Sequence, residues 1–227
     1  TNTLLLDAVQ EGVPSGSVVM CEEQTAGRGR RGRSWLSAPG DSLTFSLLWR
    51  FPPGTAPTGL SLAVGLAVAQ AIEKLGAGNP ALKWPNDLLL DGKKLAGILI
   101  ELQPGAPQVA VIGIGLNLRL PAALPDALRR QSAALAGAVD PNRLLAALLG
   151  ELLDVLQTFA GAGFAGLRHA WIARHAFENV PVQLLADFAA PRAGICRGVA
   201  ADGALLFEQD GRVVRVLSGE LSLRGAA

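Results

Sequence analysis

With 227 residues, the chain is long enough for one medium-sized domain, alone or with a small appendage. Half of the residues are hydrophobic, so a sizeable core can be buried, and a net charge of +1 argues against a dedicated nucleic-acid-binding protein, which usually has a broad basic excess. The two cysteines, Cys21 and Cys196, lie far apart and form no CxxC pair, which indicates a reducing compartment and a cytoplasmic protein.

Membrane and metal-binding proteins are disfavoured by the same inspection. The most apolar stretch, residues 59–76, contains Ser61 and Gln70 and ends in charged residues, so it predicts a buried core helix and not a membrane span. His169 and His175 are six positions apart and would lie on different faces of a helix, so we interpret them as surface or core histidines. No signal peptide is visible, and the absence of an initial Met indicates that the sequence starts inside a longer protein.

Strands dominate the predicted first half of the chain. Residues 17–23 form a short apolar strand candidate, and in residues 41–51 large apolar side chains occupy every second position, which is a strong strand signal. The side chains on that face are Leu43, Phe45, Leu47, Trp49 and Phe51. Residues 82–102 predict a strand, an Asp-Gly hairpin turn at 91–92 and a returning strand, and residues 108–118 predict a third strand antiparallel to its neighbour.

A long amphipathic helix is predicted in the second half. Asp140 and Pro141 are typical of a helix start, as N-cap and first-turn proline. One stripe of the helix carries Leu144, Leu145, Leu148, Leu149, Leu152, Leu153 and Leu156. Glu151 and Asp154 lie on the opposite face, so the leucine stripe should pack on the core.

The pattern changes again from about Asn179 onward. Short apolar segments follow one another closely, with Asp-Gly turns at residues 202–203 and 210–211, which indicates a small all-β unit. We therefore predict an α+β fold with two domains: a mixed β-sheet with helices packed on it in residues 1–178, and a small β-barrel in residues 179–227.

An arginine- and glycine-rich stretch, GRGRRGRSW, occupies residues 27–35 and contains four arginines and three glycines. Glycines let backbone N–H groups approach a ligand, and arginines offer forked donors that match carboxylate or phosphate. Such a loop could close on a substrate, and the alternative is a solvated basic turn. Because the net charge of the whole chain is close to zero, we expect a small anionic ligand and not a long polyanion.

The same stretch formally matches the dinucleotide-binding fingerprint G-x-G-x-x-G at Gly27, Gly29 and Gly32. That fingerprint requires a strand before it and a helix after it. Here a turn and another strand follow, so we reject a Rossmann site. The sequence also contains no Walker A motif and no GxSxG motif.

The block KWPND at residues 83–87 places Lys83 and Asp87 four positions apart in a short extended segment, because Pro85 prevents a helix there. Lys94 follows just past the predicted hairpin turn. Lys83, Lys94 and Asp87 therefore all lie close in sequence to one predicted turn.

Glycines also interrupt two predicted neighbouring strands, at Gly97 and at Gly113 and Gly115. Glycine weakens a strand and often marks a place where a ligand or another backbone approaches closely. The pattern therefore suggests a floor on which a flat ligand lies, and the alternative is a bulge or tight packing.

Together these motifs resemble the biotin–protein ligase family in its bacterial form. GRGRRGRSW resembles the family's biotin loop, KWPNDLLLDGKKLAGILIE its Lys-Trp-Pro-Asn-Asp block, and IGIGLNL the strand that closes the site. The opening Thr1-Asn2 resembles the end of a Ser-Thr-Asn biotin motif, and SGELSLR at residues 218–224 resembles a C-terminal signature. The resemblance covers essentially the whole chain and implies a class II aminoacyl-tRNA-synthetase-like catalytic domain followed by an SH3-like barrel.

The resemblance implies an enzyme with two half-reactions that requires ATP and Mg²⁺. The carboxylate of biotin attacks the α-phosphate of ATP to give biotinyl-5′-AMP and pyrophosphate, and an acceptor lysine then takes the biotin. The implied partner is the biotin carboxyl carrier domain of acetyl-CoA carboxylase or a related carboxylase. A homodimer formed through a sheet edge is plausible from the family, and we expect neither DNA nor a membrane as a partner of this chain.

The resemblance also implies a set of site residues. Those implied for biotin binding are Thr1, Asn2, Gln24, Arg28, Gly29, Arg30, Lys94, Gly97 and Gly113. Those implied for nucleotide binding are Arg30, Arg33, Trp35, Lys94, Asn117 and Arg224. Those implied for catalysis are Lys94, Arg30, Lys83 and Asp87. Lys94 is the best candidate for a catalytic group, Asp87 either holds magnesium or orients Lys83, and Trp35 is expected to pack the loop more than to touch a ligand.

The chain departs from the family pattern in three places. The serine expected before Thr1 is missing, so part of the biotin motif lies outside this numbering. Many bacterial members carry an N-terminal winged-helix repressor domain, which is not found within these residues, so the chain taken alone would be a ligase and not a repressor. The connection at residues 121–140 contains no aromatic residue, so the adenine should pack on aliphatic side chains where some members use a tryptophan.

Three alternative functions stay open. A lipoate–protein ligase would run the same adenylation but would lack the arginine- and glycine-rich loop in this form. A nucleic-acid-binding module conflicts with the near-neutral charge, and strongly salt-dependent DNA binding would revive it. A non-catalytic biotin or nucleotide sensor conflicts with the presence of Lys83, Lys94 and Arg30.

Overall fold

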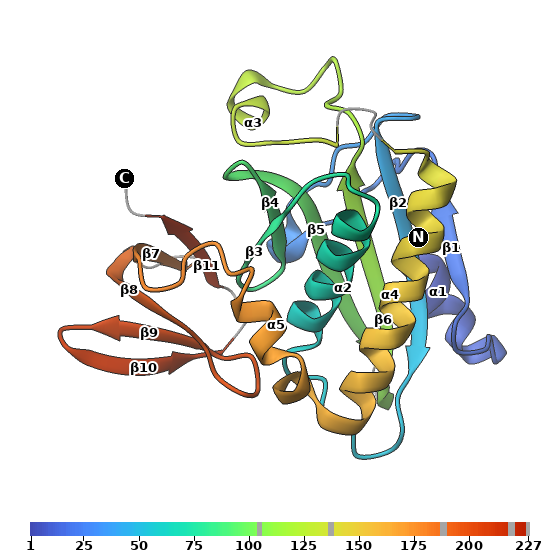
Figure 1. Ribbon diagram of the computed structural model, residues 1–227. Helices are drawn as coiled ribbons and strands as arrows, with labels where there is room; N and C mark the ends of the chain where they lie inside the picture. Colours follow the sequence, from blue (N-terminus) through green and yellow to red (C-terminus); the bar gives the residue numbers. More distant parts are fainter. Residues whose placement is uncertain (104–105, 136–138, 187–189, 218–220, 226–227) are drawn as a thin grey trace.

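The computed structural model describes residues 1–103, 106–135, 139–186, 190–217 and 221–225 (Figure 1). The helices are α1 (Asn2–Ala8), α2 (Leu60–Lys74), α3 (Asp126–Arg129), α4 (Pro141–Ala162) and α5 (Arg168–Ile172). The strands of the first sheet are β1 (Val18–Cys21), β2 (Ser42–Arg50), β3 (Ala81–Lys83), β4 (Asp87–Leu90), β5 (Lys93–Gln103) and β6 (Ala106–Asn117). Those of the second are β7 (Pro181–Ala186), β8 (Arg192–Val199), β9 (Leu205–Gln209), β10 (Arg212–Val216) and β11 (Leu221–Gly225).

The first sheet has the strand order β1-β2-β6-β5-β4-β3, and its strand pairs are antiparallel. Parallel pairing among the described residues is confined to two isolated bridges, Leu82–His175 and Lys94–Ser132. The predicted α+β class is confirmed. The predicted sheet was mixed, with both parallel and antiparallel pairs. In the part of the chain that the structure describes, parallel pairing is limited to these two bridges, which attach later segments of the chain to the sheet.

Helices α2 and α4 lie side by side over one face of this sheet (Figure 1). Helix α2 is apolar on nearly every side and is buried as the predicted core helix. Helix α4 begins as predicted, because the Asp140 carboxylate accepts hydrogen bonds from the N–H groups of Asn142 and Arg143 at 2.9 and 3.0 Å. Its buried stripe is narrower than predicted, since Leu153 is 44% exposed.

Helix α4 is long and apolar enough to span a membrane by length and composition alone. In this fold its apolar face packs on the core instead: Leu144, Leu148 and Phe159 are fully buried, and the Phe159 ring lies 5.6 Å from the Phe51 ring. Glu151 on α4 also pairs with Lys74 on α2 at 2.8 Å. The helix therefore packs its apolar face on the main core.

The opposite face of the sheet is covered in part by α1. Leu5 of α1 packs with Leu48, Val109 and Val111 in a small separate cluster. The predicted alternation in β2 is confirmed, because Leu43, Phe45, Leu47 and Phe51 are buried in the main core and Trp49 packs against it. The short N-terminal helix thus brings Thr1 and Asn2 onto the face that does not carry α2 and α4.

The segment 82–90 differs from the prediction of one continuous strand. It folds back on itself as β3 and β4, with Lys83 paired to Asp87 across the turn Trp84-Pro85-Asn86. Trp84 is fully buried, and its Nε1–H donates to the Gly203 carbonyl at 3.1 Å. The buried indole and the proline together replace extended backbone by a tight turn, so the lysine and the acid face each other. The predicted Asp-Gly hairpin turn at 91–92 is confirmed, with both residues at positive φ.

The second sheet contains β7 to β11 in the order β10-β9-β8-β7-β11 and lies at the β3 side of the first sheet (Figure 1). The Asp-Gly turns at 202–203 and 210–211 join its strands as predicted. The C-terminal signature supplies β11 at residues 221–225, which pairs with β7. The domain boundary at 178/179 and the SH3-like barrel stay predictions, and residues 187 and 218–220 of the predicted strands and signature lie outside the described residues.

His175 lies at the junction of the two sheets, with a fully buried side chain. Its ring packs against that of Trp171 in a tilted arrangement, with the centroids 4.6 Å apart, and its Nδ1 lies 3.1 Å from the Glu178 carboxylate. Burial lowers the pKa of His175 below its ordinary value and raises that of the neighbouring Cys196 to about 11. Within the described ranges no cluster of three metal-ligating side chains occurs, so His175 is a core histidine.

Candidate active site

A cavity of about 770 Å³ opens on the sheet face that carries the N-terminal residues. Its lining includes each residue that the sequence analysis proposed for the site. These are Thr1, Asn2, Gln24, Arg28, Gly29, Arg30, Arg33, Trp35, Lys83, Asp87, Lys94, Gly97, Gly113, Asn117 and Arg224. The fold therefore gathers segments from both sheets around one space, whereas the role of each side chain stays a prediction.

One end of the cavity is built from neutral hydrogen-bonding groups. Gln24 Nε2 donates to Thr1 Oγ1 at 3.1 Å. Ser46 Oγ lies 2.6 Å from Thr1 Oγ1 and 2.5 Å from Asn2 Oδ1. Asn2 is only 7% exposed and Ser46 is fully buried, so the bond between these two is shielded from water. A neutral polar group bound here would find donors and acceptors already in place.

The floor consists of two rows of residues that run across neighbouring strands. Ser46, Gly113 and Leu99 are paired in the first row, and Thr44, Gly115 and Gly97 in the second. The glycines of the two strands lie side by side as expected, and the second row continues to Asp87 on β4, whereas a flat ligand on these rows stays a prediction.

Side chains from elsewhere lie directly on these glycines. A Cβ atom on Gly113 would collide with the Asn2 amide, and one on Gly115 would collide with the Trp35 indole. The glycines are needed for close approach, as predicted, and the flat group on the second row in this structure is the Trp35 ring. Its Nε1–H is buried without a hydrogen-bond partner among the described residues.

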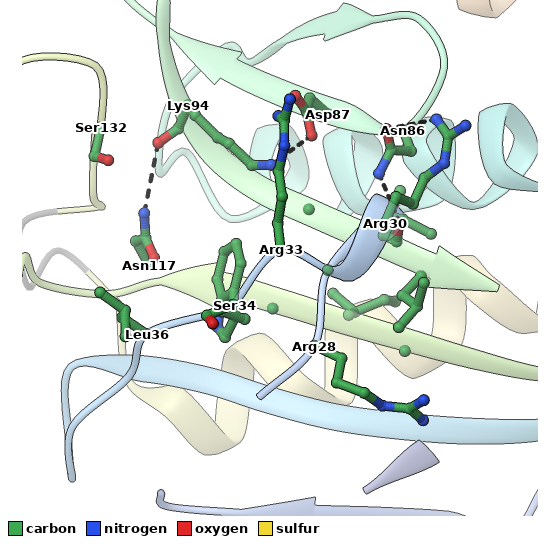
Figure 2. Close-up of a pocket in the computed structure, with 18 of the residues that line it drawn as sticks. Arg28, Arg30, Arg33, Ser34, Leu36, Asn86, Asp87, Lys94, Asn117 and Ser132 are labelled. Atoms are coloured by element: carbon green, nitrogen blue, oxygen red, sulfur yellow. Dashed lines mark hydrogen bonds and ion pairs between the residues drawn. The ribbon is translucent and has the colours of Figure 1, made fainter. Parts of the chain in front are cut away.

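The arginine- and glycine-rich loop folds as a narrow hairpin over the cavity. Trp35 N–H donates to the Gly27 carbonyl at 2.9 Å, and Gly29 N–H to the Arg33 carbonyl at 2.6 Å. Arg31 and Gly32 form the tip at positive φ. The loop therefore presents Arg30 and Arg33 to one end of the cavity and Arg28 to the other, as Figure 2 shows.

The end of the cavity that lies away from Thr1 and Asn2 carries several charged side chains. Asp87 lies between two lysines, with its Oδ2 3.5 Å from Lys83 Nζ. Its Oδ1 lies 2.7 Å from Lys94 Nζ, as Figure 2 shows for this pair. A register shift in the β4–β5 pairing, next to Leu88 and Leu89, sets the direction of Lys94 on β5. Burial lowers the pKa of Lys83, against the attraction of Asp87 and with the repulsion of the nearby Lys94 and Arg224.

Arg30 is held above this charged end by Asn86. The Arg30 guanidinium donates to Asn86 Oδ1 at 3.2 Å, and Asn86 Nδ2 donates to the Ile98 carbonyl at 2.8 Å (Figure 2). Burial is the largest cause that lowers the pKa of Arg30, and the charge of Asp87 opposes it. An arginine stays protonated at physiological pH even so, and the site thus holds a fixed cation beside the two lysines.

Asn117 anchors the connection that follows β6. Its Nδ2 donates to the Ala133 carbonyl at 2.9 Å, and the Lys94 backbone bonds to Gln131 and Ala133 on the same connection at 2.8 Å each. The aliphatic side chains expected for adenine are present in the cavity lining as Leu120, Pro121, Leu124 and Leu128. Arg224 of β11 is exposed and reaches the cavity from the second sheet.

The described residues do not form a protein cage for magnesium. Asp87 is the carboxylate proposed for it, and both of its oxygens already face lysine ammonium groups. Mg²⁺ requires near-octahedral oxygen ligands and is usually held by carboxylates together with substrate phosphates. These lysine contacts favour the second of the two roles predicted for Asp87, which is to orient Lys83, and Asp87 pairs with Lys94 as well.

Sequence reasoning missed three residues of this site. Ser46, Asn86 and Glu101 each make hydrogen bonds to residues that were predicted. For Ser46 a signal was present, because Ser42, Thr44 and Ser46 alternate with the apolar residues of β2. Glu101 was signalled only as an acid near the end of an apolar strand.

Comparisons with known proteins agree with this geometry. A family model described as the biotin/lipoate A/B protein ligase family matches residues 1–117. The chain is 41% identical to the bifunctional ligase/repressor BirA of Escherichia coli, with 100% of this chain and 72% of that protein covered. It is 36% identical to the biotin–[acetyl-CoA-carboxylase] ligase of Mycobacterium tuberculosis, with 97% and 84% covered.

A solved structure extends the likeness to the whole fold. The biotin protein ligase of Aquifex aeolicus in complex with biotin and ATP has a TM-score of 0.83 and 29% sequence identity, covering 94% of this chain and 91% of that one. The match includes both sheets, because so little of either chain is left out. The chain belongs to the biotin/lipoate A/B protein ligase family, and within that family to the biotin–protein ligases.

Proposed function

We propose that this chain activates biotin with ATP and then attaches it to a lysine of a carrier protein. The observation that carries the proposal is the division of one cavity into a neutral hydrogen-bonding end and a cationic end, on a floor of glycines. The ureido ring of biotin is neutral and needs both donors and acceptors, whereas the valeryl carboxylate and the ATP phosphates are anions. A cavity with these two ends suits biotin and ATP together.

In the first half-reaction a carboxylate oxygen of biotin attacks the α-phosphorus of ATP. The new P–O bond gives biotinyl-5′-AMP, and the bond to pyrophosphate breaks. Two anions must approach, so fixed cations and good positioning are the main requirements. We assign this role to Lys94, with Asp87 holding its ammonium group in place at 2.7 Å and Lys83 and Arg30 adding positive charge.

In the second half-reaction the amine of an acceptor lysine attacks the carbonyl carbon of the mixed anhydride. The amine loses a proton, an amide bond forms, and AMP leaves. Because the anhydride is hydrolysable, a loop that covers it and excludes water raises the yield. The hairpin of residues 27–35, with Trp35 packed on the floor, is suited to this task.

The proposed acceptor is the biotin carboxyl carrier domain of acetyl-CoA carboxylase or a related carboxylase. Similar proteins are named as biotin–[acetyl-CoA-carboxylase] ligases, which supports this partner. Homodimer formation, the lack of DNA binding by this chain and a cytoplasmic location stay predictions. Sedimentation of the purified chain and DNA titration at low and high salt would test the first two.

The decisive test is ATP–pyrophosphate exchange with biotin, with lipoate and with neither acid. We expect exchange that depends on biotin and ignores lipoate, because the neutral end can pair with a ureido ring that lipoate lacks. Exchange with lipoate alone would identify a lipoate ligase. Transfer of labelled biotin to a carrier domain, with a domain lacking the acceptor lysine as control, would test the second half-reaction.

A further inference from the structure

Glu101 on β5 connects the two segments that were predicted to hold biotin, although it does not itself line the cavity. One oxygen of its carboxylate, Oε2, accepts a hydrogen bond from Asn2 Nδ2 at 2.8 Å and another from Arg28 Nη2 at 3.1 Å. Asn2 belongs to the N-terminal segment and Arg28 to the hairpin loop. A single carboxylate therefore ties both segments to the sheet.

We propose that Glu101 is a positioning residue for biotin, which sets the direction of the hydrogen bonds at the neutral end and holds the base of the loop. This inference rests on the proposed function, since it assigns a role within biotin binding. It follows from the chemistry of the groups, because a carboxylate can only accept hydrogen bonds and must be faced by N–H or O–H groups.

The first step concerns the Asn2 amide. Because Glu101 accepts from it, the NH₂ group of Asn2 must point toward the carboxylate, and its second hydrogen lies toward the Leu99 carbonyl at 3.3 Å. The amide oxygen is then left to face Ser46 Oγ at 2.5 Å. With the opposite orientation, two oxygens would face each other across 2.8 Å.

The second step carries this direction on to Thr1. Ser46 Oγ donates toward Thr1 Oγ1 as well as toward Asn2 Oδ1, at 2.6 and 2.5 Å, so its one hydroxyl hydrogen is shared between these two oxygens. Thr1 Oγ1 in turn accepts from Gln24 Nε2 at 3.1 Å. The oxygens of Thr1 and Asn2 therefore both act as acceptors in this row, and acceptors of this kind match the two N–H groups of a ureido ring.

Of the two hydrogen bonds that Glu101 accepts, the one from Arg28 should contribute less. Its side chain is 51% exposed, and exposed ion pairs contribute little. The Asn2 bond is part-buried and charge-assisted, and a charge-assisted bond is roughly twice as strong as a neutral hydrogen bond. The effect of removing the charge at Glu101 should therefore be felt mainly through Asn2.

The test is the variant Glu101→Gln, which keeps the size of the side chain but can donate as well as accept. Binding of biotin alone would be measured by calorimetry, and the KM values for biotin and ATP by pyrophosphate exchange. We expect the biotin affinity to fall about 10-fold, equivalent to about 1.4 kcal/mol. The KM for ATP and the kcat at saturating biotin should stay within about threefold. The matched control is Glu151→Gln, which breaks an ion pair between α2 and α4 and should bind biotin like the wild type.

A second variant, Ser46→Ala, removes the middle of the row without changing any charge. If the row acts as one unit, the losses from Glu101→Gln and Ser46→Ala should be clearly less than additive in the double variant. If Glu101→Gln lowers the unfolding temperature so far that binding cannot be measured, the proposal is tested by Ser46→Ala, which should still lose biotin affinity and not ATP affinity.

Three outcomes would overturn the inference. These are wild-type biotin affinity in Glu101→Gln, equal losses of biotin and ATP affinity, and full additivity in the double variant. If the wild-type protein itself binds no biotin, the proposed function fails first and the inference fails with it. Wild-type binding with an unaffected Glu101→Gln variant would refute the inference alone.

Discussion

The two ends of the cavity lie on one sheet but differ in the side chains that they present. At the neutral end, Thr1, Asn2 and Ser46 are joined by short hydrogen bonds and carry no charge. At the cationic end, Lys83 and Lys94 flank a single carboxylate, Asp87. The first arrangement recognises shape and hydrogen-bond direction, and the second concentrates charge.

The difference indicates that recognition of the neutral ring and the reaction of the anions take place at different ends of the cavity. Hydrogen bonds at the neutral end fix the directions of its polar groups, so they favour one orientation of a small neutral ring. The cationic end has more positive than negative charge nearby, and burial lowers the pKa of Lys83 there. An excess of buried cations is stabilised when anions arrive, which is the situation of a carboxylate meeting a triphosphate.

The largest effect should come from removing Lys94. In Lys94→Ala we expect biotin-dependent pyrophosphate exchange to fall about 10²- to 10³-fold, because one preorganised donor to the reacting phosphate is lost. The unfolding temperature should change little, since the Lys94 side chain is 39% exposed. Lys74→Ala, at an exposed lysine that pairs with Glu151, is the control. A normal exchange rate in Lys94→Ala would refute its catalytic role.

A substitution on the floor should affect the neutral end next most strongly. In Gly113→Ala the new methyl group would collide with the Asn2 amide. Overpacking costs about 1–3 kcal/mol, which corresponds to about a 5- to 150-fold loss of biotin affinity. The KM for ATP should be unchanged.

The matched control for this variant is Gly150→Ala on the exposed side of α4, where a Cβ would meet nothing within 4 Å. It should bind biotin normally. If both alanine variants bind biotin equally well, Asn2 is not needed in its present place.

The pH dependence should distinguish the ends as well. Burial lowers the pKa of Lys83 below its ordinary value of 10.5, so its charge is lost at a lower pH than that of an exposed lysine as the pH rises. The KM for ATP should therefore rise on the alkaline side before pH 10.5, while biotin affinity changes less. Lys83→Arg keeps its charge and should move part of this rise to higher pH; an identical profile in the variant would contradict the prediction.

The same shift has a consequence for stability. Between the folded pKa of Lys83 and 10.5, the unfolded chain binds more protons, so this group makes the free energy of unfolding increase as the pH rises through that window. The charged lysine is thus held at some expense of stability at neutral pH, which is common at functional sites.

The smallest effect is expected from Arg33, which is exposed on the loop. Arg33→Gln should raise the KM for ATP by no more than about fivefold, because exposed charges contribute about 0–1 kcal/mol. The effect should vanish at high salt, and biotin affinity should not change. Arg143→Gln, at an exposed arginine of α4, serves as the control. A loss as large as that of Lys94→Ala would place Arg33 at the reacting phosphate.

Much of the fold could be predicted because the patterns are local. The alternation in β2, the Asp-Gly turn at 91–92 and the N-cap of Asp140 each depend on a few neighbouring residues. The break between β3 and β4 was missed because the buried Trp84 bonds to Gly203, more than a hundred residues away. A pattern within one segment carries no information about such a contact.

For the site, too, the motifs predicted which residues take part, but not how these residues are placed. The motifs identified the residues that line the cavity, and the family followed from them. They did not identify Glu101, Asn86 or Ser46, because each acts through a partner that is distant in sequence: Asn2 and Glu101 are 99 positions apart. Trp35 was expected to pack the loop, but its position on the Gly115 row is visible only in the folded chain.

The sequence by itself determined which chemical groups are available and what family the chain belongs to, because motif residues stay adjacent in the chain whatever the fold does. Only the tertiary structure decided that Asp87 faces two lysines, that Asn2 lies on Gly113 and that Glu101 joins the N-terminal segment to the loop. Hydrogen-bond direction and charge pairing depend on distances of about 3 Å, and those distances are set by strand register and by the packing of segments far apart in the sequence.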